Sequence, residues 1–404
     1  EVKNKLSEQD LYLGRLLVEL DKRNSWEYLT LIVVSDHGMT SVSNYIDLES
    51  ILEGHGIPSE VYEGPAVANI FLEENNIENF QDEYGNIIAK ISGTEGEHRP
   101  IAYVAHMDHP GYEIVRIEDG FFVGKSLGGV PRAAANKGAD CISFDQENNR
   151  YPCSIEPWDG GEEGEVKVVS EKRLDVGTPL TFDLQDFSLE GDRIEMRALD
   201  DLAGCASILA ALIELNREPV ETDIFGIFTR AEEVGLVGAG LISAETTVPI
   251  DTFIVSVETS SVIPGVEQGM GPVIRTGDAS YTFDAEAEQI LALAKNTLVS
   301  EDKNFKWQRQ LMAAGSCEAT AFAVHGYSTT GVAFPLGNWH NATTKIPDPN
   351  GSIGMENISL EDFLHGTNLI YTSARMVHTD SVSPVKERLR EVQEKLKNRL
   401  YRLT

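Results

Sequence analysis

The chain has 404 residues, 41% of them hydrophobic, and a formal net charge of −32 at pH 7. This length can bury a sizeable core and suggests two or three domains, whereas the strong negative charge argues against nucleic acid or a membrane surface as a partner. No apolar run approaches the roughly 18–20 residues of a membrane span. No signal peptide is visible and the four cysteines form no close-spaced motif, so we expect a cytoplasmic protein with reduced thiols.

The first 78 residues differ in character from the rest of the chain. A predicted buried strand there is followed by Ser35-Asp36-His37-Gly38-Met39. This segment resembles a metal-binding stretch of the nucleotide pyrophosphatase/phosphodiesterases of the alkaline phosphatase superfamily, and the resemblance implies that Asp36 and His37 match two ligands of one zinc. The nucleophilic threonine and the remaining ligands of that family have no counterpart. We therefore expect residues 1–78 to be an inactive phosphodiesterase-like fragment; a simple loop cap is the alternative for Asp36 and His37.

From residue 79 the pattern predicts a mixed α/β fold. A hairpin is expected at 80–89, and the apolar run 101–105 predicts a strand that delivers His106. Asp108, two residues later, would point to the same side of an extended chain, where a carboxylate can hold the second ring nitrogen of a metal-bound histidine. We expect the neighbouring His109 to face solvent or to pack in a loop.

Residues 111–190 are rich in Gly, Asp, Glu and short β-type runs, with little helical periodicity. This composition predicts a small β-barrel-like domain inserted into the α/β domain. The chain ends in a highly charged segment at 381–404, which we expect to form a solvated or partner-facing helix.

Further predicted strands lead to acidic residues. The runs 194–199, 222–228 and 251–257 precede Asp200-Asp201, Glu232-Glu233 and Glu258, respectively, and the strand 331–335 leads to His340. Helices are expected at 202–215, within 282–298, from 318 onward and at 361–376. Asp201 could simply cap the helix that follows it. Of the adjacent pair Glu232 and Glu233, one could bind a metal while the other faces a substrate.

In an open α/β sheet, strand ends share the edge at which ligands bind. Two imidazoles and several carboxylates at one edge predict a metal site, and paired divalent metals can polarise a carbonyl group and generate hydroxide from water.

The order and spacing of these motifs over residues 79–380 resemble the tetrahedral and glutamyl aminopeptidases, which belong to the dinuclear zinc exopeptidases. The resemblance implies a zinc-exopeptidase-like mixed sheet flanked by helices, formed by residues 79–110 and 191–380. It also implies that the insert at 111–190 is a β domain used in dimerisation and in larger homo-oligomers.

The resemblance further implies a site with two divalent metal ions per subunit, zinc or else cobalt. By this likeness His106 and Glu258 complete one metal, Glu233 and His340 the other, and Asp200 bridges both. Glu232 matches the general base and Asp108 the carboxylate that orients a histidine. No other cofactor site is implied.

The chain departs from the family pattern at several positions. Asp201 stands where the family commonly has Asn, Glu258 where Asp is usual, and His109-Pro110 where an acidic residue follows His-Met-Asp; the family's Gly-Thr-Asp-Ala stretch appears as Gly315-Ser316-Cys317-Glu318-Ala319. The sequence thus predicts a metal-dependent aminopeptidase acting on peptides, with unknown preference for the N-terminal residue. The alternatives are a dinuclear metal amidohydrolase or deacylase on a small substrate, and a non-enzymatic metal-binding protein.

Overall fold

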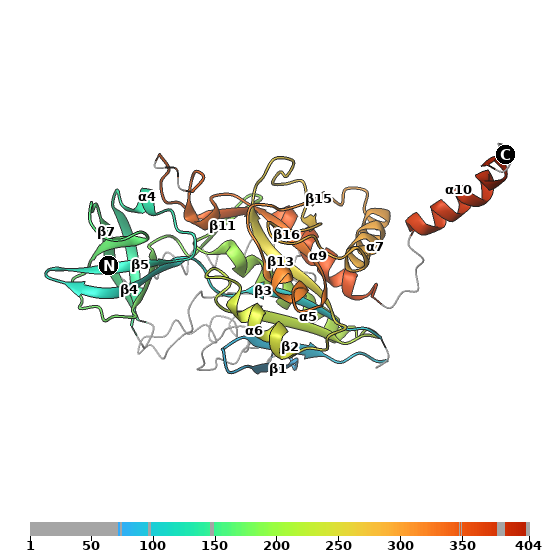
Figure 1. Ribbon diagram of the computed structural model, residues 1–404, viewed down its shortest axis with the longest axis horizontal. Coiled ribbons are helices and arrows are strands. Elements are labelled where there is room, and N and C mark those ends of the chain that lie inside the picture. Colours follow the sequence, from blue (N-terminus) through green and yellow to red (C-terminus); the bar gives the residue numbers. More distant parts are fainter. Residues whose placement is uncertain are drawn as a thin grey trace. The chain divides into compact units, whose positions relative to one another are not determined.

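The computed structural model describes residues 72, 75–95, 98–145, 149–346, 348, 350–377 and 384–400. Asp36 and His37, with nearly all of the predicted phosphodiesterase-like fragment, lie outside the described residues. Figure 1 shows the elements of the described part, which form one large sheet with its helices, a barrel and a small third sheet.

The large sheet has eight strands in the order β1-β2-β12-β3-β13-β16-β14-β15. Its four central strands β12, β3, β13 and β16 run parallel, whereas β2 and β14 pair antiparallel to them. Every residue of β3 and of β12 is buried, as is typical of parallel strands covered on both faces. The strands are β1 Glu78–Gln81, β2 Ile87–Ile91, β3 Ile101–His106, β12 Ile224–Thr229, β13 Phe253–Ser261, β14 Val273–Arg275, β15 Gln308–Gln310 and β16 Ser328–Leu336.

Helices pack on both faces of this sheet. On one face, Val104 of β3 joins a core with Ile242 of α6 and Phe322 of α8. On the other, the hydroxyl group of Tyr103 donates to the carbonyl of Ile370 in α9 at 3.1 Å. Gly226 of β12 allows α5 to approach closely, because a Cβ there would meet a Leu212 methyl group at 2.5 Å. The helices are α5 Leu199–Arg217, α6 Val237–Glu245, α7 Ala285–Glu301, α8 Glu318–Ala323 and α9 Leu360–Ala374.

The segment between β3 and α5 forms a closed six-stranded barrel in the order β4-β5-β8-β7-β6-β9. Its interior is filled by apolar side chains that include Ile114, Ile155 and Val168. This barrel and the mixed α/β sheet confirm the predicted fold class. The strands are β4 Gly111–Glu118, β5 Phe121–Leu127, β6 Ala139–Phe144, β7 Arg150–Glu156, β8 Glu165–Val169 and β9 Pro179–Phe182, and the short helix α4 covers Arg132–Ala135.

A third sheet joins β10 Phe187–Glu190, β11 Arg193–Met196 and β17 Glu356–Ser359. A 3-10 turn, η2, spans Trp339–Asn341, and the C-terminal helix α10 spans Pro384–Leu400. Within the described residues, no helix is both long and apolar enough to cross a bilayer.

Two strand predictions are corrected. The strand expected at 194–199 ends at Met196 and belongs to the small sheet, so Asp200 and Asp201 lie in an irregular first turn of α5. The strand expected to end at Glu258 continues to Ser261, because its parallel pairing with β16 extends as far as Leu336. Glu258 is therefore held inside a strand, opposite Ala333.

Candidate metal centre

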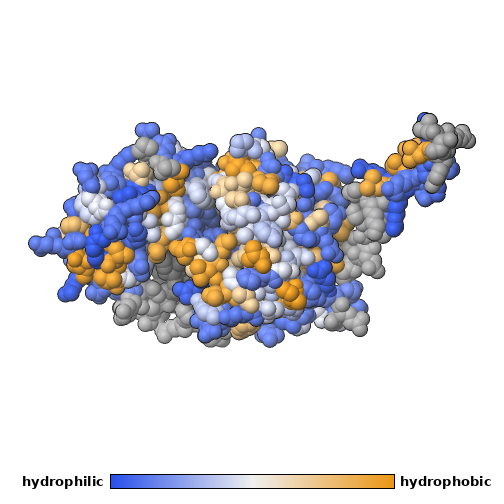
Figure 2. Space-filling view, in the orientation of Figure 1, coloured by the Kyte–Doolittle hydropathy of each residue, from blue (hydrophilic) through white to orange (hydrophobic). Residues whose placement is uncertain are grey.

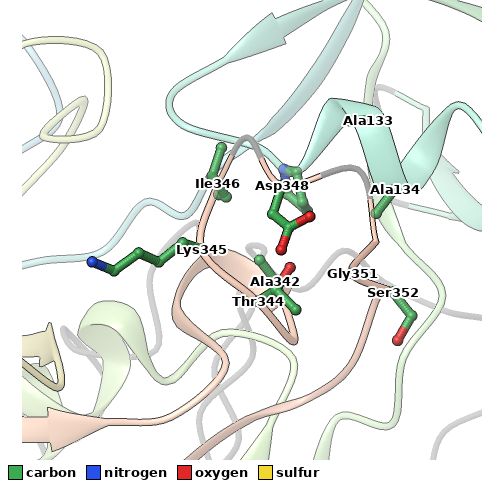
Figure 3. Close-up of a pocket in the computed structure, with 10 residues that line it drawn as sticks. Ala133, Ala134, Ala342, Thr344, Lys345, Ile346, Asp348, Gly351 and Ser352 are labelled. Carbon is green, nitrogen blue, oxygen red and sulfur yellow. The ribbon is translucent and has the colours of Figure 1, made fainter.

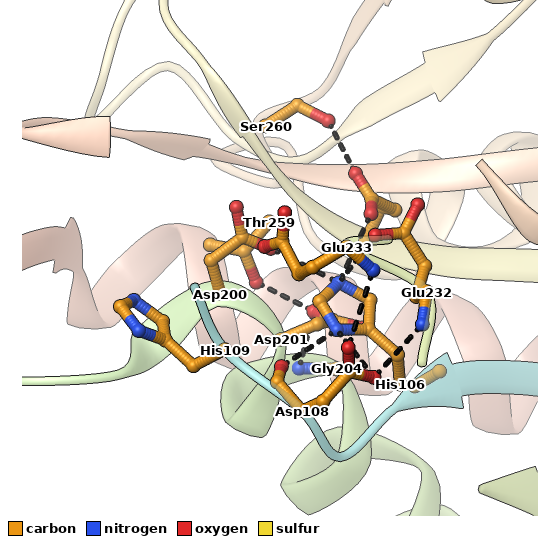
Figure 4. Close-up of polar contacts among 12 residues, drawn as sticks. His106, Asp108, His109, Asp200, Asp201, Gly204, Glu232, Glu233, Thr259 and Ser260 are labelled. Carbon is orange, nitrogen blue, oxygen red and sulfur yellow. Dashed lines mark hydrogen bonds and ion pairs between the residues drawn. The ribbon is translucent and has the colours of Figure 1, made fainter. Parts of the chain in front are cut away.

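The predicted ligands come together at one edge of the sheet, around Asp200. The Nε2 atom of His106, the last residue of β3, lies 3.3 Å from Asp200 Oδ1 and 3.4 Å from Glu258 Oε1. The Nε2 atom of His340 in η2 lies 3.2 Å from Glu233 Oε1 and 3.6 Å from Asp200 Oδ2. Each carboxylate oxygen of Asp200 thus faces a different imidazole. Figure 4 shows His106, Asp200 and Glu233 turned toward one another.

These atoms fall into three overlapping groups, in each of which all ligand atoms lie within 4.8 Å of one another. Two of the groups share Asp200, one with His106 and Glu258 and the other with Glu233 and His340. The third joins His106 to both Glu232 and Glu233. Among the described residues, the buried atoms His106 Nε2 and Asp200 Oδ1 have no hydrogen-bond partner.

Burial and mutual charge shift the pKa of nearly every group in this cluster. Burial raises the pKa of Asp200 and of Glu232, and the neighbouring carboxylate Glu258 raises both further. Burial alone would lower the pKa of His340, but the hydrogen bond and charge of Glu233 raise it to about 9. The cluster therefore holds an excess of buried negative charge that favours a cation among these side chains.

Both imidazoles are oriented by backbone carbonyl groups. His106 Nδ1 lies 2.9 Å from the carbonyl oxygen of Asp108, and His340 Nδ1 lies 2.7 Å from that of Gly129 in the loop before α4. A proton on Nδ1 would donate to each carbonyl and leave the Nε2 lone pair free. Gly129 permits this approach, since a Cβ there would meet His340 Nδ1 at 3.0 Å.

The carboxylate of Asp108 was predicted to orient a histidine, but its hydrogen bonds go to the backbone of Glu232 and Glu233. It lies 3.8 Å from His106 Nδ1, but it accepts the backbone N–H groups of Glu232 and Glu233 at 3.0 and 3.2 Å. The chain turns after β3, so Asp108 no longer follows the alternation of the strand and its side chain reaches the loop after β12. Figure 4 shows these two contacts below the cluster.

Several residues of the site escaped the sequence analysis. Of the two alternatives expected for His109, packing in a loop is the one found: its side chain is 10% exposed, and its Nε2 lies 3.3 Å from Oε1 of Glu356, a contact that the sequence did not suggest. Glu356 itself is fully buried, and no local motif marked it. Glu318, noticed only as a departure from the family pattern, accepts the hydroxyl groups of Thr229 and Ser256.

Asp201 caps the regular part of α5, which begins after the non-helical residues Asp200 and Asp201. Its Oδ1 accepts the N–H of Gly204 at 3.1 Å and the hydroxyl of Thr259 at 2.7 Å. The simple capping role considered from the sequence is therefore present.

A small pocket is lined by residues that follow Gly129 and His340 closely in the chain (Figure 3). It lies between α4 of the barrel and the loop that follows η2, and Pro131, Ala134, Ala342, Lys345 and Ser352 line it. Ala342 follows His340 by two positions and Pro131 follows Gly129 by two.

The site thus consists of histidines and carboxylates buried at one edge of a largely parallel sheet. Comparison with known proteins shows what the chain resembles. Residues 165–349 match the model of the M42 glutamyl aminopeptidase family. An aminopeptidase-like protein of Acetivibrio thermocellus is 25% identical over 295 residues, which cover 67% of this chain and 84% of that protein. These matches confirm the resemblance to the glutamyl aminopeptidases seen in the sequence and indicate a peptidase.

Solved structures share the fold. A peptidase of Pyrococcus horikoshii that can assemble into a tetrahedron or a large octahedral shell is 20% identical, with a TM-score of 0.61, over 76% of this chain and 93% of that one. An aminopeptidase of the archaeon Desulfurococcus kamchatkensis is 21% identical, with a TM-score of 0.62, over 79% of this chain and 93% of that one.

The N-terminal resemblance is also confirmed. Residues 1–119 match the model of type I phosphodiesterases/nucleotide pyrophosphatases. An ectonucleotide pyrophosphatase/phosphodiesterase of Caenorhabditis elegans is 33% identical over 94 residues, which are 23% of this chain and 12% of that protein. The match runs past Glu78, from which point the chain is hydrogen-bonded into the peptidase sheet and barrel.

Proposed function

We propose that this chain is a metal-dependent aminopeptidase that removes N-terminal residues from peptides. The observation that carries the proposal is the position of Asp200, whose two carboxylate oxygens face two separate histidine–glutamate pairs, His106 with Glu258 and His340 with Glu233. A bridging carboxylate between two such pairs is the arrangement that a two-metal site requires.

The residues present fit two divalent cations. Buried carboxylates are costly unless they are paired or bind a metal, and Asp200 Oδ1 and His106 Nε2 are buried without hydrogen-bond partners among the described residues. Neutral imidazole and carboxylate donors are those that zinc accepts. His106, Asp200 and Glu258 would hold one ion, and Asp200, Glu233 and His340 the other. When bound, the two ions would polarise the scissile carbonyl group and lower the pKa of the attacking water.

The proton transfers are assigned to Glu232. Its Oε2 lies 3.8 Å from His106 Nε2, and its backbone is fixed by the carboxylate of Asp108. As the water oxygen bonds to the carbonyl carbon, Glu232 would take the water proton. It would then deliver that proton to the leaving amine nitrogen as the C–N bond breaks. In this scheme Asp108 keeps Glu232 and Glu233 in place.

Turnover of matched substrates tests the proposal. The purified protein, supplied with zinc or cobalt, is expected to release p-nitroaniline from amino-acid p-nitroanilides, and a chelator is expected to abolish this activity. The N-acetylated counterparts should resist cleavage because they lack a free N-terminal amine. Release of acetate from the acetylated substrates, without release of p-nitroaniline, would favour a deacylase. Bound metal without turnover of either set would favour a metal-binding protein.

We also propose that the protein forms homo-oligomers through its barrel. Apolar side chains are exposed there, with Ile117 at 47%, Leu127 at 40% and Val176 at 63%, and Figure 2 shows apolar patches over the part of this face where the barrel lies. The assembly described for the Pyrococcus horikoshii peptidase supports the proposal.

We further propose a cytoplasmic location. The four cysteines are buried and unpaired, which supports this location.

A further inference from the structure

We propose that Glu356 is a positioning residue that fixes the bridging Asp200 and the ligand His340 at once; this inference rests on the two-metal site proposed above. Its Oε2 accepts the backbone N–H groups of Leu199 and Asp200 at 2.7 and 3.0 Å. Its Oε1 accepts the backbone N–H of His340 at 2.8 Å. A single carboxylate thus holds the bridging residue and a ligand of the second metal.

The two segments held by Glu356 need a partner from outside. Asp200 has φ −85° and ψ 101°, away from helical values, at the start of α5, and His340 has φ 55° and ψ 36°, in the left-handed region. In the described structure, the residues that precede α5 and η2, Ala198 and Asn338, provide no side-chain cap. The first N–H groups of a helix lack partners within it, so Glu356 caps both elements and thereby sets where their side chains point.

Glu356 can do this because its own backbone is fixed. It is the first residue of β17 and pairs with Met196 of β11, and its side chain is fully buried. His109 Nε2, 3.3 Å from Oε1, places a further polar partner on the His340 side. Both oxygens of the carboxylate therefore accept hydrogen bonds, which leaves the side chain little freedom to rotate.

Replacing Glu356 by glutamine tests whether both acceptor oxygens are needed. Glutamine has nearly the same size but only one acceptor oxygen, and its amide nitrogen is a donor. Whichever way the amide turns, either the Asp200 end or the His340 end must face a donor in place of an acceptor. Mutation of residues that hold metal ligands in place typically lowers metal affinity by about 10- to 100-fold.

The chain offers a matched control in Asp362 of α9. This residue is also fully buried, and its carboxylate likewise accepts two backbone N–H groups, those of Gly269 and Gly271, at 2.7 and 2.6 Å. Neither glycine is next to a proposed ligand. Asp362→Asn should therefore cost stability without touching the metal centre.

The experiment titrates metal-free full-length protein with Co²⁺ against a competing chelator and records the visible absorption spectrum of the bound ions. Thermal unfolding of each metal-free variant is measured in parallel. We expect Glu356→Gln to weaken Co²⁺ binding about 10- to 100-fold and to alter the spectrum. Asp362→Asn should lower the unfolding temperature while leaving affinity within about twofold and the spectrum unchanged.

Glu356→Asp serves if the glutamine variant does not fold. Its carboxylate is one methylene shorter and cannot reach both segments, so affinity should again fall, by less than for glutamine. Unchanged affinity and spectrum in whichever variant folds would overturn the inference, and so would equal weakening by Asp362→Asn, because that would show general loosening. Wild-type protein that binds no Co²⁺ would instead overturn the two-metal proposal, and this inference with it.

Discussion

Arg275 reaches Glu258 from within the protein interior, with its Nη1 3.4 Å from Glu258 Oε2. The same oxygen accepts the hydroxyl group of Ser260 at 2.8 Å. Oε2 is therefore engaged on the side away from the histidines, and Oε1 is left turned toward His106. The side chain of Arg275 is only 2% exposed, so it is a buried positive charge placed directly behind a proposed metal ligand.

The first prediction concerns this arginine. Arg275→Gln should destabilise the metal-free protein by about 3–5 kcal/mol, because removing one partner of a buried ion pair leaves the other charge uncompensated. Urea unfolding measures the change. The matched control is Arg309→Gln, which breaks the surface pair with Glu288 and should cost about 1 kcal/mol or less. Equal losses in the two variants would mean that Glu258 does not depend on Arg275.

The second prediction separates the two adjacent glutamates. Glu232→Gln should lower turnover by about 100- to 10,000-fold, because it removes the proposed general base, while both metals stay bound. Glu233→Gln should instead lower the occupancy of the metal shared with His340. Metal analysis of the purified variants decides between them. Loss of metal from Glu232→Gln, with two ions kept in Glu233→Gln, would reverse the assignment.

The third prediction concerns acid stability of the barrel. Hydrogen bonds from Arg116 and from the N–H of Glu162 lower the pKa of Glu165 from its ordinary value of 4.5 to about 2. Since the unfolded chain takes up this proton first as the pH falls, the stabilisation is complete above about pH 5 and is lost between there and pH 2. The wild type should therefore exceed Glu165→Gln in unfolding free energy at pH 7, and the gap should shrink toward pH 3. A gap that stays constant across this range would contradict the assignment.

The fourth prediction concerns the N-terminal segment. Deletion of residues 1–71 should leave peptide hydrolysis within a few fold of the full chain, and neither form should cleave a nucleotide phosphodiester. The cut is placed before Leu72 and Ile77, since both are buried in the described part. Hydrolysis of a p-nitrophenyl phosphodiester, measured beside peptidase activity, checks it. Phosphodiesterase activity that disappears in Asp36→Ala would show a working second site.

The sequence predicted those parts of the centre that are encoded by local pattern. Apolar strands that lead to His106 and to Glu232-Glu233 predicted that these side chains meet, because parallel strands bring their ends to one edge. The sequence could not predict that the backbone carbonyl of Asp108, rather than its carboxylate, lies nearest to His106 Nδ1, because the turn after β3 determines this. Glu356 and Arg275 left no local signal, because each reaches the site across tertiary contacts.

The barrel is tied to the chemistry by its own backbone. The chain enters it immediately after Asp108 and His109, and the carbonyl of Gly129, in the loop between β5 and α4, holds the ring of His340. The position of that loop therefore helps to set the orientation of an imidazole in the candidate centre. A substitution in the barrel that shifts this loop would therefore reach His340 through a single hydrogen bond, without altering any proposed ligand.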